Sequence, residues 1–528
     1  MRIKNGDGWA SRYREMSRML YQVRRLAPHL GILGISTLHP RYPIPADQME
    51  LMKLLDKMDQ KTAKARMPSF LSLWVGGSIS LLYAVRESLN IAHLRLRFAP
   101  ALRRLKKEPI DLLIKSWCFG IEPSDGSGDF YYGTLGEDLQ KKGIRPLFLC
   151  GDARGRMTKE LARHLFEKRP VRAVPEAVLV PMWAPFVAVW GQLRGVLRIR
   201  RLGLRSGDAR FAAVCAAVSS YGMNPATLRH SLYFYIAREA VKAWKPRALV
   251  TLYEGQPWEK LAWHGARAAD PRCRIIGYQH TVVMPQSLSL LSPNQGSWEL
   301  SAPDAVLCLG EVTRKMMEEG HRPFGSRLIR FGSFRRTNGS AGGHPPQPER
   351  RTVLVLPVGV LDEAVLLFNF AIKLAESCPG YRFIFRCHPV LPFDRVRPHL
   401  TGSLERLSNI EISKEGVISS DFGRSSTVLY HGSSAVLYAV LDGLKPLYLH
   451  FEQLPDTDPL FQMSEWKEPV FSAEGAARAL EIYGSVSAAE AARQWRGAFD
   501  YVQGYAPSVD ESSVGSLLDL IGSREDAG

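Results

Sequence analysis

The chain has 528 residues, 45% of them apolar and 23% charged, which excludes a disordered or fibrous protein and leaves room for two core domains with extensions. Its formal net charge of +17 is uneven, because residues 1–107 hold 20 Lys and Arg against 7 Asp and Glu. Seven scattered cysteines without a C-x-x-C pair argue against a disulfide framework and favour a reducing compartment.

Residues 1–108 are predicted to form a basic, helical N-terminal region, because Met49–Met58 and Ala92–Leu105 show apolar residues at spacings of three and four. The charge, +13 over residues 1–107, fits a solvated helical surface. It also fits attraction to an anionic membrane surface, where each basic residue contributes about 1 kcal/mol. No nucleic-acid-binding module accompanies it, so nucleic acid is not an expected partner.

Two stretches are poor in charge, Pro68–Val85 and Ala177–Leu193. Both are short for a membrane span, and glycines or prolines interrupt them, so buried segments are the first interpretation. Docking at a membrane interface is the alternative, since the second stretch runs into five arginines between residues 194 and 205.

From residue 110 onward, short apolar runs alternate with amphipathic segments, which is typical of parallel, doubly wound sheets. The expected strands of the first half are Ile110–Ser116, Ile144–Cys150, Ala248–Tyr253, Arg274–Tyr278 and Ala305–Leu309. The expected helices between and after them are Tyr132–Lys142, Pro225–Trp244, Trp258–Ala269 and Glu311–Glu319.

The segment 335–351 is rich in Gly, Pro and charge and has no apolar periodicity, which is the composition of a linker. The alternation then restarts. The expected elements are strands Thr352–Val358, Tyr381–Arg386, Ile410–Ser413, Thr427–His431 and Pro446–His450, with helices Asp362–Cys378 and Ala435–Gly443, and helices again over Ala476–Gly522.

The predicted fold class is therefore α/β, with two Rossmann-like doubly wound domains facing a cleft and a helical, basic N-terminal extension. The expected boundaries are 1–108 for the extension, 109–336 for the first domain, 337–351 for the linker, 352–480 for the second domain and 481–528 for the C-terminal helices.

Polar residues follow two strands of the first half. Glu254 and Gly255 follow the strand Ala248–Tyr253, and Gln279 and His280 follow the next strand, Arg274–Tyr278. Since the carboxyl ends of parallel strands share one edge, these residues belong to one layer of loops. Glu254 can serve as a general base, with His280 as an acceptor-site residue. Glu259 is better explained as an acid at a helix start.

In the second half, His388-Pro389 follows one strand, and Gly432-Ser433-Ser434 follows another and opens a helix. An imidazole, two hydroxyls and the N–H groups of a helix start suit a phosphate-sized anion. The two serines also suit simple helix caps, and that alternative stays open. Arg386 and Lys414 are further candidates for assisting the phosphate site.

A D-x-D sequence, Asp456-Thr457-Asp458, lies between two prolines and is better explained as a polar turn than as a metal site. No His, Cys or Asp cluster has metal-ligand spacing, and the sequence has neither a Walker-type phosphate loop nor a nucleophile elbow.

With these residues placed, the region 110–480 resembles GT-B-fold glycosyltransferases of bacterial surface and capsular polysaccharides. It is most similar to the sialyltransferase and Kdo-transferase groups and to the surface carbohydrate biosynthesis proteins near them. Glu254-Gly255, His388-Pro389 and Ser433-Ser434 match the motifs of these groups in type, order and position. One position departs: Tyr253 stands where these groups carry a first acid.

The resemblance implies inverting transfer from a nucleotide sugar, with a CMP-linked donor and a lipid-linked or polysaccharide acceptor. Glu254 would deprotonate the acceptor hydroxyl, while His388, Gly432, Ser433 and Ser434 would hold the departing phosphate. It implies no obligatory metal or other cofactor, and a cytoplasmic enzyme peripheral to the inner membrane face. No specific protein partner follows from the sequence.

Two alternatives share these motifs. One is a polyol-phosphate transferase that uses a CDP-linked donor. The other is a non-catalytic subunit of a polysaccharide assembly complex, which the missing acid at Tyr253 leaves open.

Overall fold

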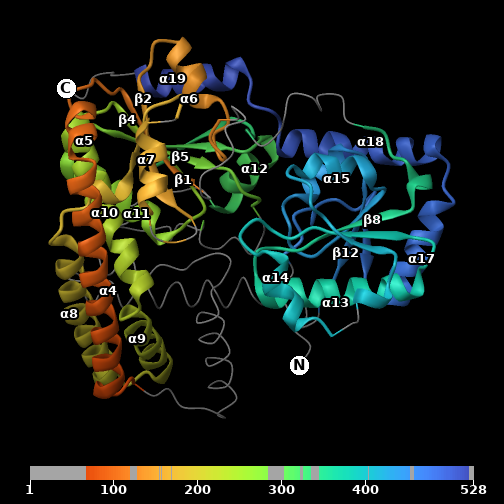
Figure 1. Ribbon diagram of the computed structural model, residues 1–528, viewed down its shortest axis with the longest axis horizontal. Coiled ribbons are helices and arrows are strands. Elements are labelled where there is room, and N and C mark those ends of the chain that lie inside the picture. The colour runs from red at the N-terminus through yellow and green to blue at the C-terminus, as the bar shows by residue number, and fades with distance from the viewer. Residues whose placement is uncertain are drawn as a thin grey trace.

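The computed structural model describes residues 67–118, 128–153, 155, 157–167, 169–283, 290, 302–321, 325–334, 344–401, 404–451 and 457–522. The helix predicted over Met49–Met58, most of the basic extension and the first part of the predicted linker, 337–343, lie outside the described residues. Two parallel sheets, each flanked by helices, confirm the predicted pair of doubly wound α/β domains (Figure 1).

The first sheet has seven parallel strands in the order β3-β2-β1-β4-β5-β6-β7 among the described residues. The strands are β1 (Leu112–Cys118), β2 (Pro146–Asp152), β3 (Ala173–Pro175), β4 (Ala248–Leu252), β5 (Arg274–Gln279), β6 (Ala305–Cys308) and β7 (Arg327–Arg330). Most of these strands are buried from end to end, as expected for a parallel sheet covered on both faces. The short edge strands β3 and β7 were not predicted.

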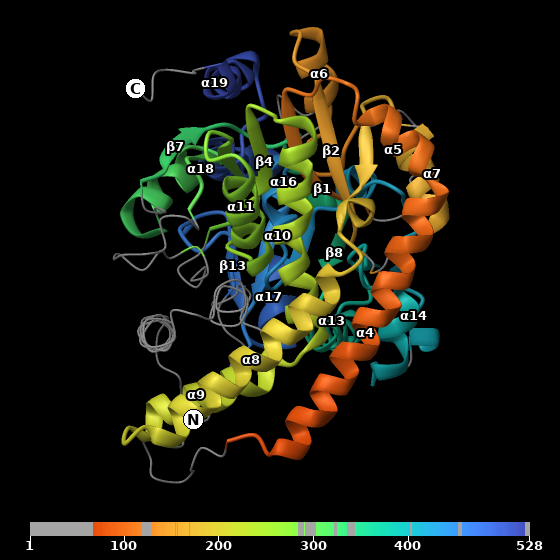
Figure 2. The ribbon, with the colours of Figure 1, turned by 90° about the vertical axis from the view of Figure 1, so that its left-hand side faces the viewer.

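Helices of this domain cover both faces of the sheet, and some of them extend beyond it (Figure 2). They are α4 (Phe70–Arg97), α5 (Ala99–Leu105), α6 (Leu135–Lys141), α7 (Lys159–Glu167), α8 (Ala184–Arg205), α9 (Ala209–Gly222), α10 (Pro225–Trp244), α11 (Pro257–Ala269) and α12 (Glu311–Met316). The best predicted is α10. It begins at Pro225, where the Asn224 side chain accepts the N–H of Ala226 (2.8 Å), and ends before Lys245, whose φ is 47°.

The second sheet has six parallel strands in the order β10-β9-β8-β11-β12-β13 among the described residues. The strands are β8 (Thr352–Leu356), β9 (Arg382–Phe385), β10 (Ile410–Ile412), β11 (Thr427–Tyr430), β12 (Lys445–Leu449) and β13 (Glu468–Val470). Its helices are α13 (Leu361–Ser377), α14 (Phe393–Val396), α15 (Ile418–Arg424), α16 (Val436–Leu441), α17 (Ala473–Gly484) and α18 (Ala488–Tyr505).

The end of the chain returns to the first domain, which the sequence did not reveal. The last helix, α19 (Glu511–Gly522), places Val514, Leu517 and Leu520 in the hydrophobic core of the first sheet. Just before it, Tyr505 at the end of α18 donates its hydroxyl to the carbonyl of Val283 (3.1 Å). The chain thus passes back from the second domain to the first between α18 and α19 (Figure 1).

The N-terminal part that the structure describes belongs to the first domain. The second half of α4 and helix α5 bury Ile91, Leu94, Phe98 and Leu102 in that domain's core. The first half of α4 instead runs beside α8, which packs against α9, and these helices extend beyond the body of the molecule (Figure 2). We call α4, α8 and α9 the helical projection.

The two charge-poor stretches lie in or beside this projection. Residues 177–180 are buried as expected, but both stretches also expose large apolar side chains, which the interpretation as buried segments did not predict. Leu71, Trp74 and Leu82 are exposed on α4, and Trp183 and Trp190 are exposed before and on α8. The expected interruption at Pro185 is a helix start, because proline fits the first turn of α8. Among the described residues, no helix combines the length and apolar character needed to cross a bilayer.

Candidate active site

The first sheet reverses its winding between β1 and β4. Strand β2 lies beyond β1 on one side, and β5 lies beyond β4 on the other. In open parallel sheets, ligands bind beyond the carboxyl ends of the two strands at such a switch point. Glu254 follows β4 directly and therefore lies at this position.

The turn that carries Glu254 is held by a buried acid. Glu259, in the first turn of α11, accepts the backbone N–H groups of Glu254 (2.9 Å), Gly255 (3.0 Å) and Gln256 (3.0 Å). Gly255 has a φ of 75°, which favours glycine. Burial, and then the nearby charge of Glu254, raise the pKa of Glu259 well above its ordinary value. The prediction that Glu259 is a helix-start acid is confirmed.

The structure brings Glu254 and His280 into contact. Their Oε1 and Nε2 atoms are 3.0 Å apart, and the two side chains are 33% and 3% exposed. The amide of Gln256 lies 3.4 Å from the other carboxylate oxygen. The ring of Tyr131 packs edge-on against His280, with centroids 4.9 Å apart. The carboxylate is therefore the accessible member of the pair, and the imidazole fixes it from behind.

The two residues that flank this pair face inward. Gln279 is fully buried, and its amide accepts the N–H of Leu309 (3.2 Å) and donates to the carbonyl of Thr281, so it acts as a scaffold residue. Tyr253 is 3% exposed and its ring packs against Trp263. The position of the missing first acid thus faces the core.

A buried ion pair beside this turn escaped the sequence analysis. Lys115 in β1 lies 3.1 Å from Glu176 Oε2, and Tyr233 donates its hydroxyl to Oε1 of the same glutamate (2.8 Å). The Lys115 ammonium sits 3.7 Å from the ring centroid of Trp117 and 5.4 Å from that of Trp258. A lysine inside an otherwise apolar strand was the available signal, because a buried cation needs a partner.

Next to that ion pair lies a small polar cavity of about 50 Å³. Its lining includes Asp152, Glu176 and Arg229, and the Arg229 guanidinium donates to the carbonyls of Asp152 (3.1 Å) and Gly155 (2.8 Å). A cavity of this volume has room for water molecules but not for a sugar. We therefore interpret the ion pair as support for the strand ends that carry the candidate base.

The second sheet reverses its winding between β8 and β11. Two glycines keep this switch point clear. A Cβ on Gly359 would lie 2.9 Å from Nδ1 of His388, and a Cβ on Gly432 would lie 2.7 Å from Oγ1 of Thr457. The Cβ on Gly432 would also lie 3.3 Å from Cγ1 of Val358, so the residues after β8 are in close contact with those after β9 and β11, as a ligand crevice at these strand ends requires.

His388 is exposed at the end of β9, and its Nδ1 accepts the N–H of Val390 (3.3 Å). In a neutral imidazole this bond places the proton on Nε2, so Nε2 is the donor. The neighbouring thiol is a poor nucleophile, because burial raises the pKa of Cys387 to about 11.

The serines do not cap α16. Its N-cap residue is Ala435, without a side-chain cap, and the carbonyls rather than the hydroxyls of Ser433 and Ser434 accept N–H groups, from Val436 and Leu437. Neither hydroxyl makes a hydrogen bond within the described part of the chain. Their hydrogen-bonding capacity is thus available beside Gly432.

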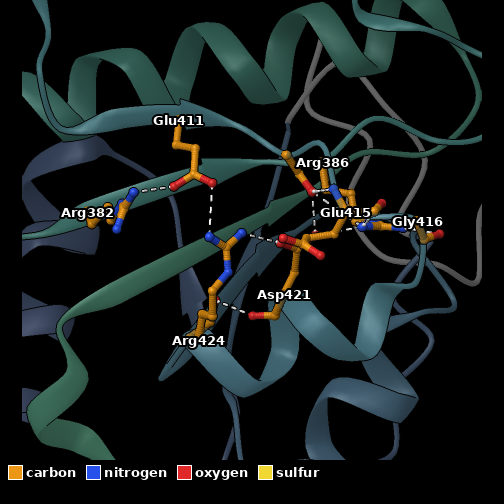
Figure 3. A network of polar contacts seen from close by, with 9 residues as sticks. Arg382, Arg386, Glu411, Glu415, Gly416, Asp421 and Arg424 are labelled. Atoms are coloured by element: carbon orange, nitrogen blue, oxygen red, sulfur yellow. Dashed lines mark hydrogen bonds and ion pairs between the residues drawn. The ribbon is translucent and has the colours of Figure 1, made fainter.

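Arg386 serves the scaffold rather than the candidate phosphate site (Figure 3). Its guanidinium donates to Asp421 (2.6 Å) and to the carbonyls of Glu415 (3.1 Å) and Gly416 (3.4 Å). Burial opposes the charge of Asp421, but hydrogen bonds from Ser413, Arg424 and Arg386 outweigh it, so the pKa of Asp421 is lowered. The network fixes the end of β9 and the loop that carries the exposed Lys414.

Asp458 is also an internal anchor. It is buried and accepts the Tyr430 hydroxyl (2.7 Å) and the N–H of Leu460 (2.9 Å), and it pairs with Lys467. Asp456 lies outside the described residues. Among the residues that are described, no three acidic, histidine or cysteine side chains are placed to hold a metal ion.

The chain matches no protein-family model and no curated protein. Solved structures with a similar trace include the glycotransferase of kitacinnamycin (11% identity, TM-score 0.45, 78% of this chain and 99% of that one). They also include the calicheamicin glycosyltransferase CalG4 (13%, 0.44, 79% and 100%) and a putative UDP-N-acetylglucosamine 2-epimerase from Listeria monocytogenes (12%, 0.44, 79% and 96%). Similarities of this size carry no argument about activity, so the case for a function depends on the site residues.

Proposed function

We propose that the chain is an inverting glycosyltransferase that moves a sugar from a nucleotide-activated donor to a hydroxyl acceptor. The observation that carries the proposal is the Glu254–His280 pair, with its 3.0 Å contact and its accessible carboxylate at the switch point of the first sheet. A carboxylate that is fixed by a buried neighbour and is also accessible to a substrate suits a general base.

In the proposed reaction, Glu254 accepts the proton of the acceptor hydroxyl as that oxygen attacks the anomeric carbon. The bond between this carbon and the donor phosphate oxygen breaks, and its electron pair leaves with the nucleotide. His280 is a positioning residue, because it is 97% buried behind the carboxylate and does not face the reacting atoms. One displacement on carbon inverts its configuration.

The second switch point would receive the departing phosphate. His388 offers an Nε2 donor, and the hydroxyls of Ser433 and Ser434 have unused hydrogen-bonding capacity beside Gly432. Hydrogen bonds aimed at the oxygen where charge develops stabilise the transition state more than the ground state. With these donors in place, the proposed reaction needs no metal ion and no cofactor.

Tyr253 faces the core, and it stands where the glycosyltransferase groups that this chain resembles carry a first acid. A carboxylate there would face the core and Trp263, so it could not reach an acceptor hydroxyl in this conformation. Glu254 alone is enough for the proposed proton transfer, which favours an enzyme over a non-catalytic subunit.

The finer assignment rests on the resemblance of the motifs. We propose a CMP-linked sugar of the sialic acid or Kdo type as donor, and a lipid-linked or polysaccharide acceptor of bacterial surface polysaccharide synthesis. The reaction would take place on the cytoplasmic side of the membrane, where nucleotide sugars are made.

Calorimetric titration of the full chain with CMP, CDP, UDP and GDP tests this donor assignment. We expect CMP to bind most tightly, and His388→Ala to weaken that binding because it removes the Nε2 donor. Tighter binding of CDP, followed by transfer of a polyol phosphate, would favour the alternative transferase. Absence of binding by all four nucleotides would contradict the proposed function.

A further inference from the structure

The helical projection exposes apolar side chains in regular stripes. On α8, the residues at spacings of three and four along one exposed face are Val187, Trp190, Arg194, Leu197, Arg201 and Leu204. On α4, the corresponding exposed face carries Leu71, Trp74, Val75, Ser78, Leu82, Val85 and Leu89. Such stripes normally face a core, yet Trp74, Leu82 and Trp190 are 74%, 70% and 65% exposed.

The opposite faces of these helices already make their packing contacts. Leu73 and Val196 meet Met223, and Ala84 and Ala188 meet Leu228. The exposed stripes are therefore additional apolar surface, which in a water-soluble domain marks a place of interaction.

The charge of the projection is almost entirely positive. Helices α4, α8 and α9 together contain nine arginines and one acidic residue, Glu87. Arg194 and Arg201 lie on the same stripe as Trp190 and Leu197, so cationic and apolar groups share one surface. The partner of this surface must offer apolar and anionic groups together.

We propose that the outward stripes of α4 and α8 dock the protein on an anionic lipid bilayer. Leu, Trp and Val side chains would enter the acyl boundary, while the arginines would contact phosphate headgroups. The two helices would lie on the membrane rather than cross it, in accord with the absence of a spanning helix among the described residues. The inference stands apart from the proposed chemistry, because none of these residues belongs to the candidate active site.

Flotation with lipid vesicles tests the apolar part. The full chain is mixed with vesicles of phosphatidylcholine, alone or with phosphatidylglycerol. We expect binding to the mixed vesicles, and roughly tenfold weaker partition for Trp74→Ser/Leu82→Ser and for Trp190→Ser/Leu197→Ser. Phe471→Ser/Ile482→Ser is the matched control, because both residues are similarly exposed (70% and 68%) but lie in the second domain.

The charge is tested by Arg194→Glu/Arg201→Glu, with Arg493→Glu/Arg496→Glu on α18 as the control for a change of net charge. We expect the first pair alone to abolish the preference for phosphatidylglycerol vesicles, and we expect high salt to weaken binding. Nucleotide affinity should be unchanged in every variant.

Three outcomes would overturn the proposal. The full chain could fail to bind mixed vesicles, or the stripe variants could bind as well as their controls. The third is a self-association surface: if the stripe variants turn a dimer into a monomer in sedimentation equilibrium while vesicle binding is unchanged, the stripes contact a second copy.

Discussion

The two switch points hold their polar groups in opposite ways. At the first sheet, the polar groups around Glu254 are paired within the protein: His280 contacts its carboxylate, and Glu259 binds the backbone of its turn. At the second sheet, His388 is exposed and the hydroxyls of Ser433 and Ser434 make no bond among the described residues. The difference indicates a preorganised group on one side, and on the other an exposed imidazole beside two hydroxyls with no hydrogen bond among the described residues, as a base and an anion site would require.

The second site owes its rigidity to the layer beneath it, where Arg386 and Asp421 are bonded as tightly as the first site's pair (Figure 3). The two domains thus differ in where the rigid network lies. In the first domain, the rigid network includes Glu254, the candidate catalytic residue. In the second domain, the network only supports the strand end that carries His388.

The largest effect on stability should come from this supporting network. Asp421→Asn removes the charge that pairs with Arg386 and Arg424, and we expect it to lower the free energy of unfolding by about 3–5 kcal/mol at neutral pH. Since the folded-state pKa of Asp421 lies below its usual 3.8, this difference should be full above that pH and shrink as the pH falls further. Denaturant melts of both proteins across this range measure it.

Asp500→Asn on the exposed side of α18 is the control for that change. It should leave the free energy of unfolding within about 0.5 kcal/mol of the wild type. An Asp421→Asn protein that is equally stable at neutral pH would show that the network does not support the second site.

A smaller effect is expected where the network holds the first site. In Glu259→Gln, the new amide group would face the N–H groups of Gly255 or Gln256, so a buried donor loses its acceptor. We expect a loss of about 1–3 kcal/mol in stability, together with lower turnover because Glu254 shifts. Thermal melts and activity assays check both.

Glu311→Gln is matched to that variant, since Glu311 is also an acid in the first turn of a helix but its side chain is 39% exposed rather than buried. Its effect should stay below about 1 kcal/mol. Equal losses in the two variants would mean that Glu259 has no special role in the turn.

The smallest effect should come from filling the space at the second site. Gly359→Ala places a methyl group 2.9 Å from Nδ1 of His388, and we expect roughly tenfold weaker nucleotide binding by calorimetry as the imidazole moves. Gly497→Ala in α18 is the control, because no heavy atom lies within 4 Å of its new Cβ. Unchanged affinity in Gly359→Ala would remove His388 from the nucleotide site.

The sequence predicted the helices and strands of the two sheets better than the contacts, and it did not predict helices α8 and α9. Helix α10 was predicted with its observed bounds, and local signals mark them, since Asn224-Pro225 opens its first turn and Pro246 follows its end. The edge strands β3 and β13, each of three residues, are too short to show a pattern. Their place depends on pairing with distant strands, which no local signal encodes.

Within the candidate site, the sequence predicted where each residue lies along its strand but not which residues it contacts. Glu254 and His280 were expected in one layer of loops, yet their contact depends on the register of β4 and β5. Arg386 looked available because its partner Asp421 lies 35 residues away. The exposed stripe of α4 was interpreted as buried because an apolar stripe in a sequence indicates a contact surface. It does not indicate whether that surface contacts the protein's own core or a partner.

In the proposed mechanism, Glu254 removes a proton from the acceptor, and the second switch point binds the nucleotide. Glu254→Gln keeps the size of the side chain and tests this most directly when turnover and nucleotide affinity are measured on the same protein, with His388→Ala beside it. We predict that Glu254→Gln lowers turnover roughly 10²–10⁴-fold at unchanged affinity, and that His388→Ala lowers both. Near-normal turnover in Glu254→Gln would contradict the assignment of Glu254 as the base.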